Sequence, residues 1–218
     1  MKNNNNNNNI AIGVLGIQGD IEENIATARQ ALTEMQLKGD ASMVIYPEQL
    51  ERVDGLILPG GESTVVSSLI TLQHGGILQI IKKAIYNGMP AMGICAGMIM
   101  LSKCAYDRVI GETKQQLIAN LDIVVERNAF GRQNDSFEVD LEIPLIGKEL
   151  FRSVFIRAPM VTEVGNEVEV IAKFNEKIVA VTQNNIIATA FHPELSGDSR
   201  LHREFIKKIL KYKQKREE

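Results

Sequence analysis

The stretch from Pro90 to Leu101 constrains the fold of this chain more than any other. It begins as an apolar run, turns between Gly93 and Gly97, and continues as a second apolar run of helical composition. A strand that feeds a helix through a Gly-x-Cys-x-Gly turn has the geometry of a nucleophile elbow, where the crowded backbone requires small neighbours. The pattern predicts that Cys95 stands between a strand and a helix of an α/β sheet.

Two interpretations of Cys95 follow from this position. At a helix N-terminus, unpaired N–H groups and the helix dipole favour an anion, and the thiolate is the reactive form of cysteine. The alternative is a buried, inert cysteine in a turn that packs a helix against a sheet. Cys95 alone does not decide between them, so the rest of the chain must supply a base.

The composition excludes several classes of function. A net charge of −3 over 218 residues gives no reason to expect nucleic acid or an anionic membrane as a partner. No apolar run reaches the roughly 18 residues of a membrane span, and the N-terminus does not resemble a secretory signal. Two cysteines do not make a disulfide framework, so we expect a reduced, cytoplasmic protein. Nothing in the sequence calls for a metal ion or a cofactor.

The order of apolar runs predicts an α/β fold with a mostly parallel central sheet and helices on both faces. Residues 1–9, with seven consecutive asparagines, are expected to be a disordered tail, and residues 10–218 a single domain. In the first half we expect strands at 10–17, 43–46, 55–58 and 90–94, and helices at 21–37 (capped by Asp20), 65–72, 77–86 and 95–105. In the second half, we expect strands at 121–126, 136–143, 154–156, 167–174, 177–182 and 186–191, and a helix at 198–215.

A base for Cys95 must come from three histidines. His74 lies between a helix end and two glycines with no acid nearby, and His202 sits in a helix, where it favours a capping or packing role. His192 differs, because Pro193 favours an extended backbone and Glu194 follows at i+2, on the same side of an extended chain. Taken alone, these three residues could be a surface pair in a loop. Combined with the elbow, they predict a base and its orienting carboxylate.

Donors for a developing oxyanion can come from the backbone. The Ala96 N–H follows the candidate nucleophile, and the Gly60-Gly61 turn follows the strand at 55–58, so these two places could supply two N–H groups. Ser63 or Thr64 could cap the helix that comes next. The Gly60-Gly61 pair is equally compatible with a simple strand-to-helix turn.

At this point the sequence resembles a known family, the class I (triad) glutamine amidotransferases, and within it the glutaminase subunits of the two-component pyridoxal 5′-phosphate synthases. The resemblance spans about residues 10 to 210 and implies the flavodoxin-like three-layer fold of these enzymes, with extra antiparallel strands. Its segments are Pro59-Gly60-Gly61-Glu62-Ser63-Thr64, Cys95-Ala96-Gly97-Met98, Glu126-Arg127-Asn128-Ala129-Phe130-Gly131-Arg132-Gln133, Phe155-Ile156-Arg157-Ala158-Pro159, and Phe191-His192-Pro193-Glu194-Leu195 with Asp198, Arg200, His202 and Phe205. Ile94, where a Thr or Ser often stands, and Gly16, in place of a usual Ala, depart from the pattern without removing a catalytic group.

The resemblance implies a mechanism and a set of site residues. Cys95 would attack the side-chain amide of L-glutamine, and His192, oriented by Glu194, would protonate the departing ammonia, leaving a γ-glutamyl thioester for water to hydrolyse. Gly61 and Ala96 would form the oxyanion hole. The residues implied in glutamine binding are Gly61, Glu62, Ser63, Arg127, Ile156 and Arg157. A free amino acid carries a carboxylate and an ammonium, which matches the opposite charges of Arg127 and Glu62.

The resemblance also implies a partner. The family's ammonia passes to a synthase (lyase) subunit with a (β/α)₈ barrel, docking to that subunit usually activates the glutaminase, and Gln18 could lie at the interface. Three other readings compete: an amidotransferase subunit of another synthase, a catalytically silent regulatory or binding module of the same fold, and a cysteine peptidase of related fold. The Arg127 and Phe155 segments argue against the first, and the complete set of Cys95, His192 and Glu194 argues against the second.

Overall fold

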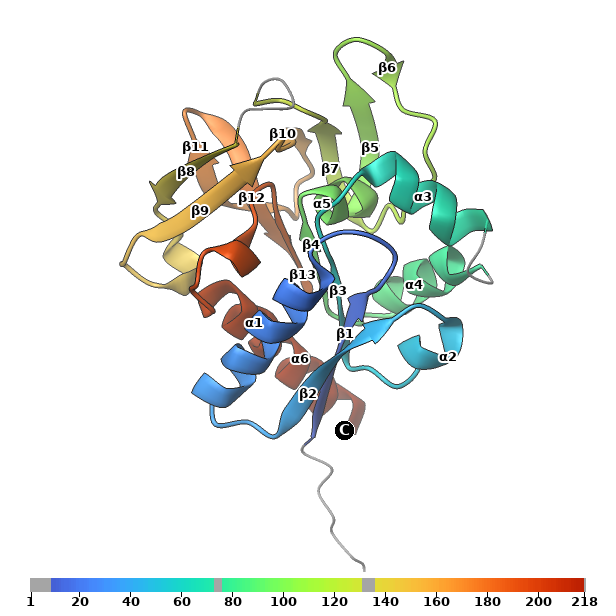
Figure 1. The fold of residues 1–218 in the computed structure, drawn as a ribbon, viewed down its shortest axis with the longest axis vertical. Helices are drawn as coiled ribbons and strands as arrows, with labels where there is room; N and C mark the ends of the chain where they lie inside the picture. Colours follow the sequence, from blue (N-terminus) through green and yellow to red (C-terminus); the bar gives the residue numbers. More distant parts are fainter. Residues whose placement is uncertain (1–8, 73–75, 131–135, 218) are drawn as a thin grey trace, which may run out of the picture.

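The computed structural model describes residues 9–72, 76–130 and 136–217. Almost the whole asparagine tail therefore lies outside the described residues, as do His74, Gly75 and the segment from Gly131 to Gln133. Within the described part, strands and helices alternate from Ile10 to Leu72, as the apolar pattern predicts (Figure 1).

A parallel array forms the centre of the main sheet. The strands β2 (Gly39–Val44), β1 (Ile10–Leu15), β3 (Gly55–Leu58), β4 (Ala91–Ile94) and β13 (Ile186–Thr189) lie side by side in that order, all parallel. Four of the five are almost wholly buried, since residues at both faces of β1, β3, β4 and β13 pack into the core. Continuous apolar runs are typical of such two-sided burial.

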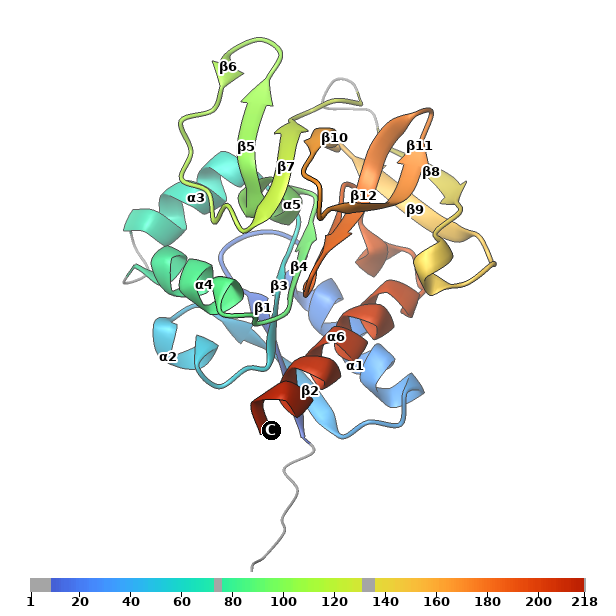
Figure 2. The ribbon, with the colours of Figure 1, turned by 180° about the vertical axis from the view of Figure 1, so that it is seen from behind.

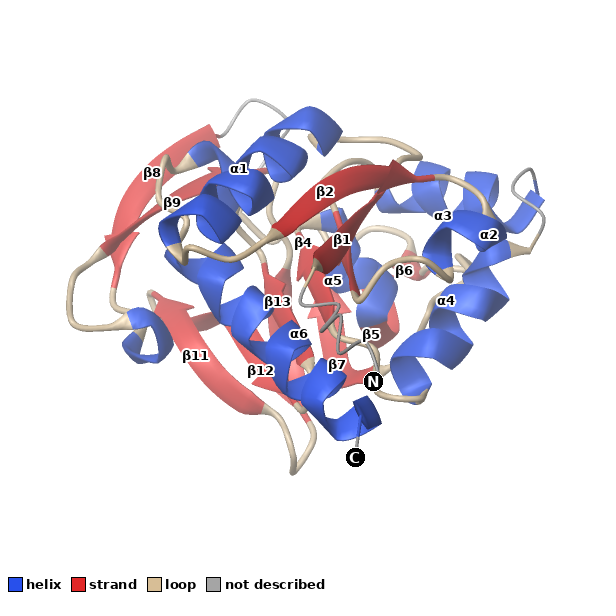
Figure 3. Cartoon of the chain, turned by 90° about the horizontal axis from the view of Figure 1, so that it is seen from below, coloured by secondary structure: helices blue, strands red, loops and turns tan. Residues whose placement is uncertain are grey.

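Helices cover both faces of this array. α1 (Ile21–Glu34) and α6 (Arg200–Glu217) pack against each other on one face. α2 (Pro47–Leu50), α3 (Ser63–Leu72), α4 (Ile77–Tyr86) and α5 (Ala96–Leu101) lie on the other side (Figure 3). The predicted three-layer α/β fold is therefore confirmed.

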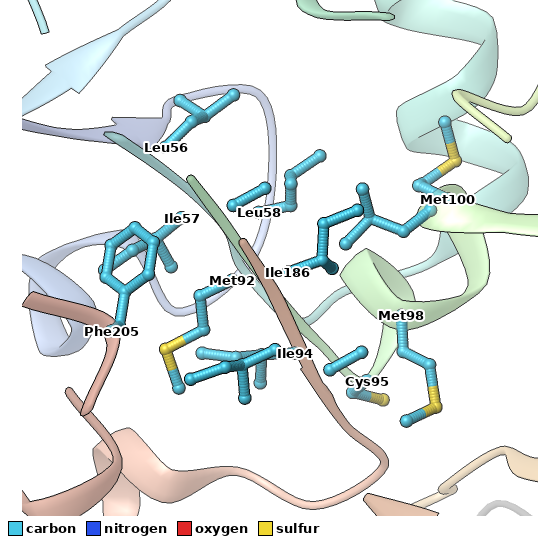
Figure 4. Packing of buried hydrophobic residues seen from close by; sticks show 14 of the residues in the cluster. Leu56, Ile57, Leu58, Met92, Ile94, Cys95, Met98, Met100, Ile186 and Phe205 are labelled. Atoms are coloured by element: carbon cyan, nitrogen blue, oxygen red, sulfur yellow. The ribbon is translucent and has the colours of Figure 1, made fainter. Parts of the chain in front are cut away.

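The core joins the three layers. Figure 4 shows Phe205 of α6 on one side of the strands and Met98 and Met100 of α5 on the other. Met92 and Ile94 of β4 lie between them, fully buried. No helix in the described ranges has the length and apolar character needed to cross a membrane.

Beyond β13 the sheet becomes mostly antiparallel (Figure 2). The neighbouring strands β13-β12-β10-β7-β5-β6 continue the sheet in that spatial order, β11 pairs with β12, and only β5 and β7 in this part run parallel. A separate two-stranded sheet pairs β8 with β9. The bounds are β5 Ser102–Asp107, β6 Gly111–Glu112, β7 Leu121–Glu126, β8 Ser136–Leu141, β9 Phe151–Ile156, β10 Met160–Val164, β11 Glu169–Phe174 and β12 Lys177–Gln183.

Several predicted elements differ from the structure in their bounds, and α2, β5, β6 and β10 were not predicted. The helix after Cys95 ends at Leu101 instead of continuing to residue 105, because Ser102 turns extended and its hydroxyl donates to the carbonyl oxygen of Ile99. The residues that follow form β5, which pairs with β7 and places Cys104 half-buried on a strand. The second strand spans Gly39–Val44 instead of 43–46.

Candidate active site

Cys95 stands where β4 ends and α5 begins. Its backbone has φ 49° and ψ −101°, a strained conformation that is held by a 2.7 Å hydrogen bond from its N–H to the carbonyl of Thr189. Gly97 is required in this turn, because a Cβ there would lie 2.1 Å from the carbonyl oxygen of Leu58. The thiol itself lies 3.9 Å from the carbonyl oxygen of Ile156. The strand–turn–helix geometry predicted from the glycines is thus present.

His192 follows β13, at the same edge of the sheet. Its N–H donates to the carbonyl of Val154 at 2.8 Å, and its side chain is buried. Ring nitrogen Nδ1 lies 2.8 Å from Oε1 of Glu194, as predicted from the i+2 spacing. The same nitrogen lies 3.2 Å from Oδ2 of Asp20, which was not predicted. With Nδ1 facing two carboxylates, the other ring nitrogen is left to serve the Cys95 thiol.

The charges around His192 favour its protonated form. Burial alone would lower the pKa of His192, but hydrogen bonds with Asp20, Cys95 and Glu194 outweigh burial and raise that pKa to about 12. The hydrogen bond to His192 in turn holds the pKa of Asp20 below its ordinary value. Burial raises the pKa of Glu194 above its ordinary value, although His192 opposes this. The carboxylates around His192 therefore make it a strong base, because they stabilise the imidazolium that forms when the ring takes a proton.

A cavity of about 210 Å³ opens in front of Cys95 and His192. This is below the roughly 300–1,000 Å³ of sites for drug-sized ligands, so the cavity suits a small metabolite. The residues that line it are Gly19, Asp20, Gly61, Glu62, Ser63, Cys95, Ile99, Arg127, Asn128, Ile156, Arg157 and His192. Every residue that was predicted to bind a ligand lines this cavity.

Arg127 and Glu62 form an ion pair in the wall of the cavity. An Arg127 Nη2 donates to Oε1 of Glu62 at 2.5 Å, whereas the buried Nε of Arg127 has no partner among the described residues. The two charges that were expected to divide between the ends of a ligand therefore pair with each other in this structure. Burial alone would raise the pKa of Glu62, but hydrogen bonds from Thr64 and Val65, with the charge of Arg127, hold that pKa below its ordinary value.

Glu62 also corrects the prediction for the start of α3. Its Oε2 accepts hydrogen bonds from the Thr64 hydroxyl and, at 2.9 Å, from the Val65 N–H. The acceptor at this helix start is therefore Glu62, instead of Ser63 or Thr64. The Ser63 hydroxyl instead donates to Oε1 of Gln115 at 3.2 Å.

The loop after β1 packs against the turn after β3. Gln18 accepts a hydrogen bond from the Glu62 N–H at 3.1 Å through its side-chain oxygen. Gly61 has φ +139°, a conformation that favours glycine, and it lies against the same Gln18 side chain. Gln18, Ala96 and Glu194 are not among the residues that line the cavity.

Sequence reasoning missed four lining residues, of which Asp20 matters most. Asp20 precedes a helix and was interpreted as its cap, yet its side chain makes no capping hydrogen bond. Another feature of the site is conformational and cannot be read from the sequence. Three non-glycine residues that line the cavity have positive φ: Cys95, Asn128 and Arg157. Backbone strain of this kind clusters at functional sites.

Ligand atoms of Asp20, His192 and Glu194 lie within 4.8 Å of one another, a spacing that a metal ion could use. The hydrogen bonds of the two carboxylates to one ring nitrogen account for that spacing. No metal is needed to explain the geometry, and the chemistry of the cluster is that of a histidine held by acids.

Comparisons with known proteins agree with this geometry. The chain matches the SNO glutamine amidotransferase family over residues 14–211. It is 43% identical to a pyridoxal 5′-phosphate synthase subunit PdxT of Nitrosopumilus maritimus, covering 93% of this chain and 98% of the relative. It is 45% identical to the PdxT of Pyrococcus furiosus, covering 92% and 100%. A crystal structure described as a glutamine amidotransferase superposes with a TM-score of 0.77 at 40% identity, covering 91% of this chain and 98% of that one.

Proposed function

Because the chain belongs to the SNO glutamine amidotransferase family, we propose that it is the glutaminase subunit of a pyridoxal 5′-phosphate synthase. In this role it hydrolyses L-glutamine to glutamate and ammonia for vitamin B6 biosynthesis. The observation that carries the proposal is Cys95 at a strained elbow beside His192, whose Nδ1 is 2.8 Å from Glu194. That is a nucleophile with its base and an orienting acid, the requirement for covalent acyl transfer.

The first half of the reaction forms a thioester. His192 takes the proton of the Cys95 thiol and becomes the imidazolium that its surroundings favour, and the thiolate sulfur attacks the amide carbon of the glutamine side chain. As the carbon–nitrogen bond breaks, His192 returns the proton to the nitrogen, which leaves as ammonia. Glu194 holds the ring in the tautomer that this transfer needs.

The oxyanion of the tetrahedral intermediate needs donors that are fixed before the reaction. Ala96 is the first residue of α5, and the first N–H groups of a helix have no partner within it. Gly61, opposite in the cavity wall, contributes a second N–H. The contact between Gln18 and the Glu62 N–H supports this role by fixing the turn that holds Gly61.

The second half hydrolyses the thioester. Once ammonia has left, His192 is neutral and can take a proton from water, whose oxygen attacks the thioester carbon. The carbon–sulfur bond breaks, the sulfur recovers its proton, and glutamate leaves.

Arg127 and Glu62 recognise the two charged groups of free glutamine. Arg127 lines the cavity, and its buried Nε has no partner among the described residues, so a carboxylate that reached the guanidinium would complete its hydrogen bonding. Glu62, already ionised by its own hydrogen bonds, offers the opposite charge to the ammonium. Ser63, Ile156 and Arg157 complete the substrate contacts as lining residues.

The partner that receives the ammonia is a synthase subunit. The curated relatives are named as subunits of a pyridoxal 5′-phosphate synthase, which supports a second subunit in the assembly. We further propose that this subunit is a (β/α)₈ barrel, that Gln18 lies at the interface, and that the complex works in the cytoplasm, where Cys95 stays reduced.

The test is glutamate release from glutamine, with and without the synthase subunit. Wild type should release glutamate, Cys95→Ala should release none, and Cys104→Ala, which changes the other cysteine outside the site, should match wild type. Turnover that survives Cys95→Ala, or no turnover by wild type with its partner present, would overturn the proposal. Cleavage of peptides without release of glutamate from glutamine would favour a peptidase.

A further inference from the structure

The ring of His192 is held by two carboxylates that come from different parts of the chain. Glu194 follows it by two residues, whereas Asp20 belongs to the loop between β1 and α1. Oε1 of Glu194 lies 2.8 Å from Nδ1, and Oδ2 of Asp20 lies 3.2 Å from the same atom. One Nδ1–H can be shared between two acceptors, so both carboxylates act on a single proton.

The local structure leaves the Asp20 side chain free for this contact. Asp20 occupies the N-cap position of α1 without making a side-chain capping bond, and its carbonyl accepts the Asn24 N–H and side-chain amide. Gly60 makes room, because a Cβ there would lie 2.4 Å from Cε1 of His192. Gly19 lets the loop approach, since its own Cβ would lie 1.7 Å from the carbonyl oxygen of Gly60.

We propose that Asp20 is a positioning residue that holds the His192 ring together with Glu194 and keeps its second nitrogen directed at Cys95. This inference rests on the proposed glutaminase function. Asp20 acts through His192 and touches no reacting atom.

The two carboxylates are unequal, and the difference assigns them different parts. The Glu194 side chain is fully buried, whereas that of Asp20 is 37% exposed. Burial raises the pKa of Glu194, and contact with His192 lowers the pKa of Asp20. Glu194 is therefore the buried contact that holds the ring from inside, and Asp20 holds it from the solvent side and adds a better-solvated negative charge.

The kinetic test compares two substitutions at Asp20 with a matched control, all as full chains bound to the synthase subunit. Asp20→Asn keeps an acceptor and removes the charge, and Asp20→Ala removes both. Glu22→Gln makes the same charge change on an exposed side chain two residues further along. We expect kcat to fall about tenfold in Asp20→Asn and further in Asp20→Ala, with KM changed by less than about twofold, and Glu22→Gln to match wild type.

A spectroscopic readout separates positioning from a structural effect. The ¹⁵N shifts of the His192 ring, followed against pH in the full chain without glutamine, should show protonation lost at lower pH in Asp20→Asn than in wild type. Glu22→Gln should leave that titration unchanged. An unchanged His192 titration in both Asp20 variants would overturn the proposal, even if kcat fell. If wild type itself released no glutamate, the proposed function would fail, yet the titration would still decide the role of Asp20.

Discussion

His192 and His202 are both buried, yet their surroundings give them opposite protonation. His192 is 3% exposed at the edge of the sheet and faces two carboxylates and a thiol, which raise its pKa to about 12. His202 is 0% exposed inside α6, and neither ring nitrogen has a hydrogen-bond partner among the described residues. Burial alone lowers the pKa of His202 to about 4, so it is neutral at pH 7.

A reactive histidine differs from a packing one in the groups that its ring faces. Burial by itself disfavours charge and lowers the pKa at both positions. Only at His192 do acids converge on the ring, and only there does the ring face a cavity. Acids beside the ring and access to a ligand, and not burial, mark the functional group.

The largest expected effect comes from removing the imidazole of His192, compared with removing that of His202. In His192→Ala, we expect glutaminase kcat/KM to fall by about 10³-fold or more, because the thiol loses its base and the leaving group its acid. Glutamate release in the complex measures this directly.

The matched variant is His202→Leu, which has a similar volume and removes the other buried imidazole. It should retain wild-type glutaminase activity at pH 7.5. Equal losses in the two variants would break the contrast and make both histidines structural.

The second test concerns stability in acid. The pKa of His202 is about 4 in the folded chain against an ordinary 6.5, so the unfolded chain binds its proton more readily. The free energy of unfolding should therefore fall as pH drops from about 6.5 to 4, with about 3 kcal/mol of the loss due to His202. Urea unfolding at pH 7.5, 5.5 and 4.5 measures it.

His202→Leu supplies the control for that measurement. This variant lacks the titrating ring, so its free energy of unfolding should fall less steeply in acid than that of wild type. At pH 7.5 the free energies of unfolding of the two proteins should differ by less than about 1.5 kcal/mol. The raised pKa of His192 affects stability in the opposite direction: its contribution to the free energy of unfolding is complete below pH 6.5 and declines as pH rises. Parallel curves for wild type and His202→Leu would contradict a neutral, buried His202.

The third test removes the orienting acid and keeps its shape. Glu194→Gln should lower kcat by about 10²-fold, because an amide can donate to Nδ1 and favour the wrong tautomer. The loss should stay below that of His192→Ala, since Asp20 still accepts from the ring. Kinetics in the complex test this, with Glu204→Gln, which pairs with Lys207 on α6 and does not line the cavity, as a control. A loss below about threefold would mean that Glu194 does not orient His192.

Part of this site could be predicted because its information is local. Gly93, Gly97 and Cys95 specify a turn within five residues, and His192 reaches Glu194 across a single proline. For the same reason most strands of the parallel array were found from their apolar runs alone.

The remainder depends on contacts between distant segments. The residues after Ser102 have helical composition, but pairing with β7 draws them into a strand. Asp20 looks like a helix cap, and only the packing of its loop on Gly60 directs the carboxylate to a histidine 172 positions away. A single sequence contains no record of either contact, because each is set by tertiary packing that overrides local preference.

Arg127 shares one feature with His202, and the smallest expected effect concerns this residue. Both have a buried nitrogen without a partner among the described residues, but that of Arg127 belongs to a residue that lines the cavity. We expect Arg127→Lys to raise the KM for glutamine about tenfold and to change kcat by less than about twofold, because lysine lacks the planar fork that binds a carboxylate. Arg29→Lys, at an exposed pair with Asp40, is the matched control and should leave KM unchanged. A fall in kcat at constant KM would assign Arg127 to the transition state instead of to substrate binding. An unchanged KM and kcat would place its unpartnered nitrogen with those of His202, as a packing defect without a ligand.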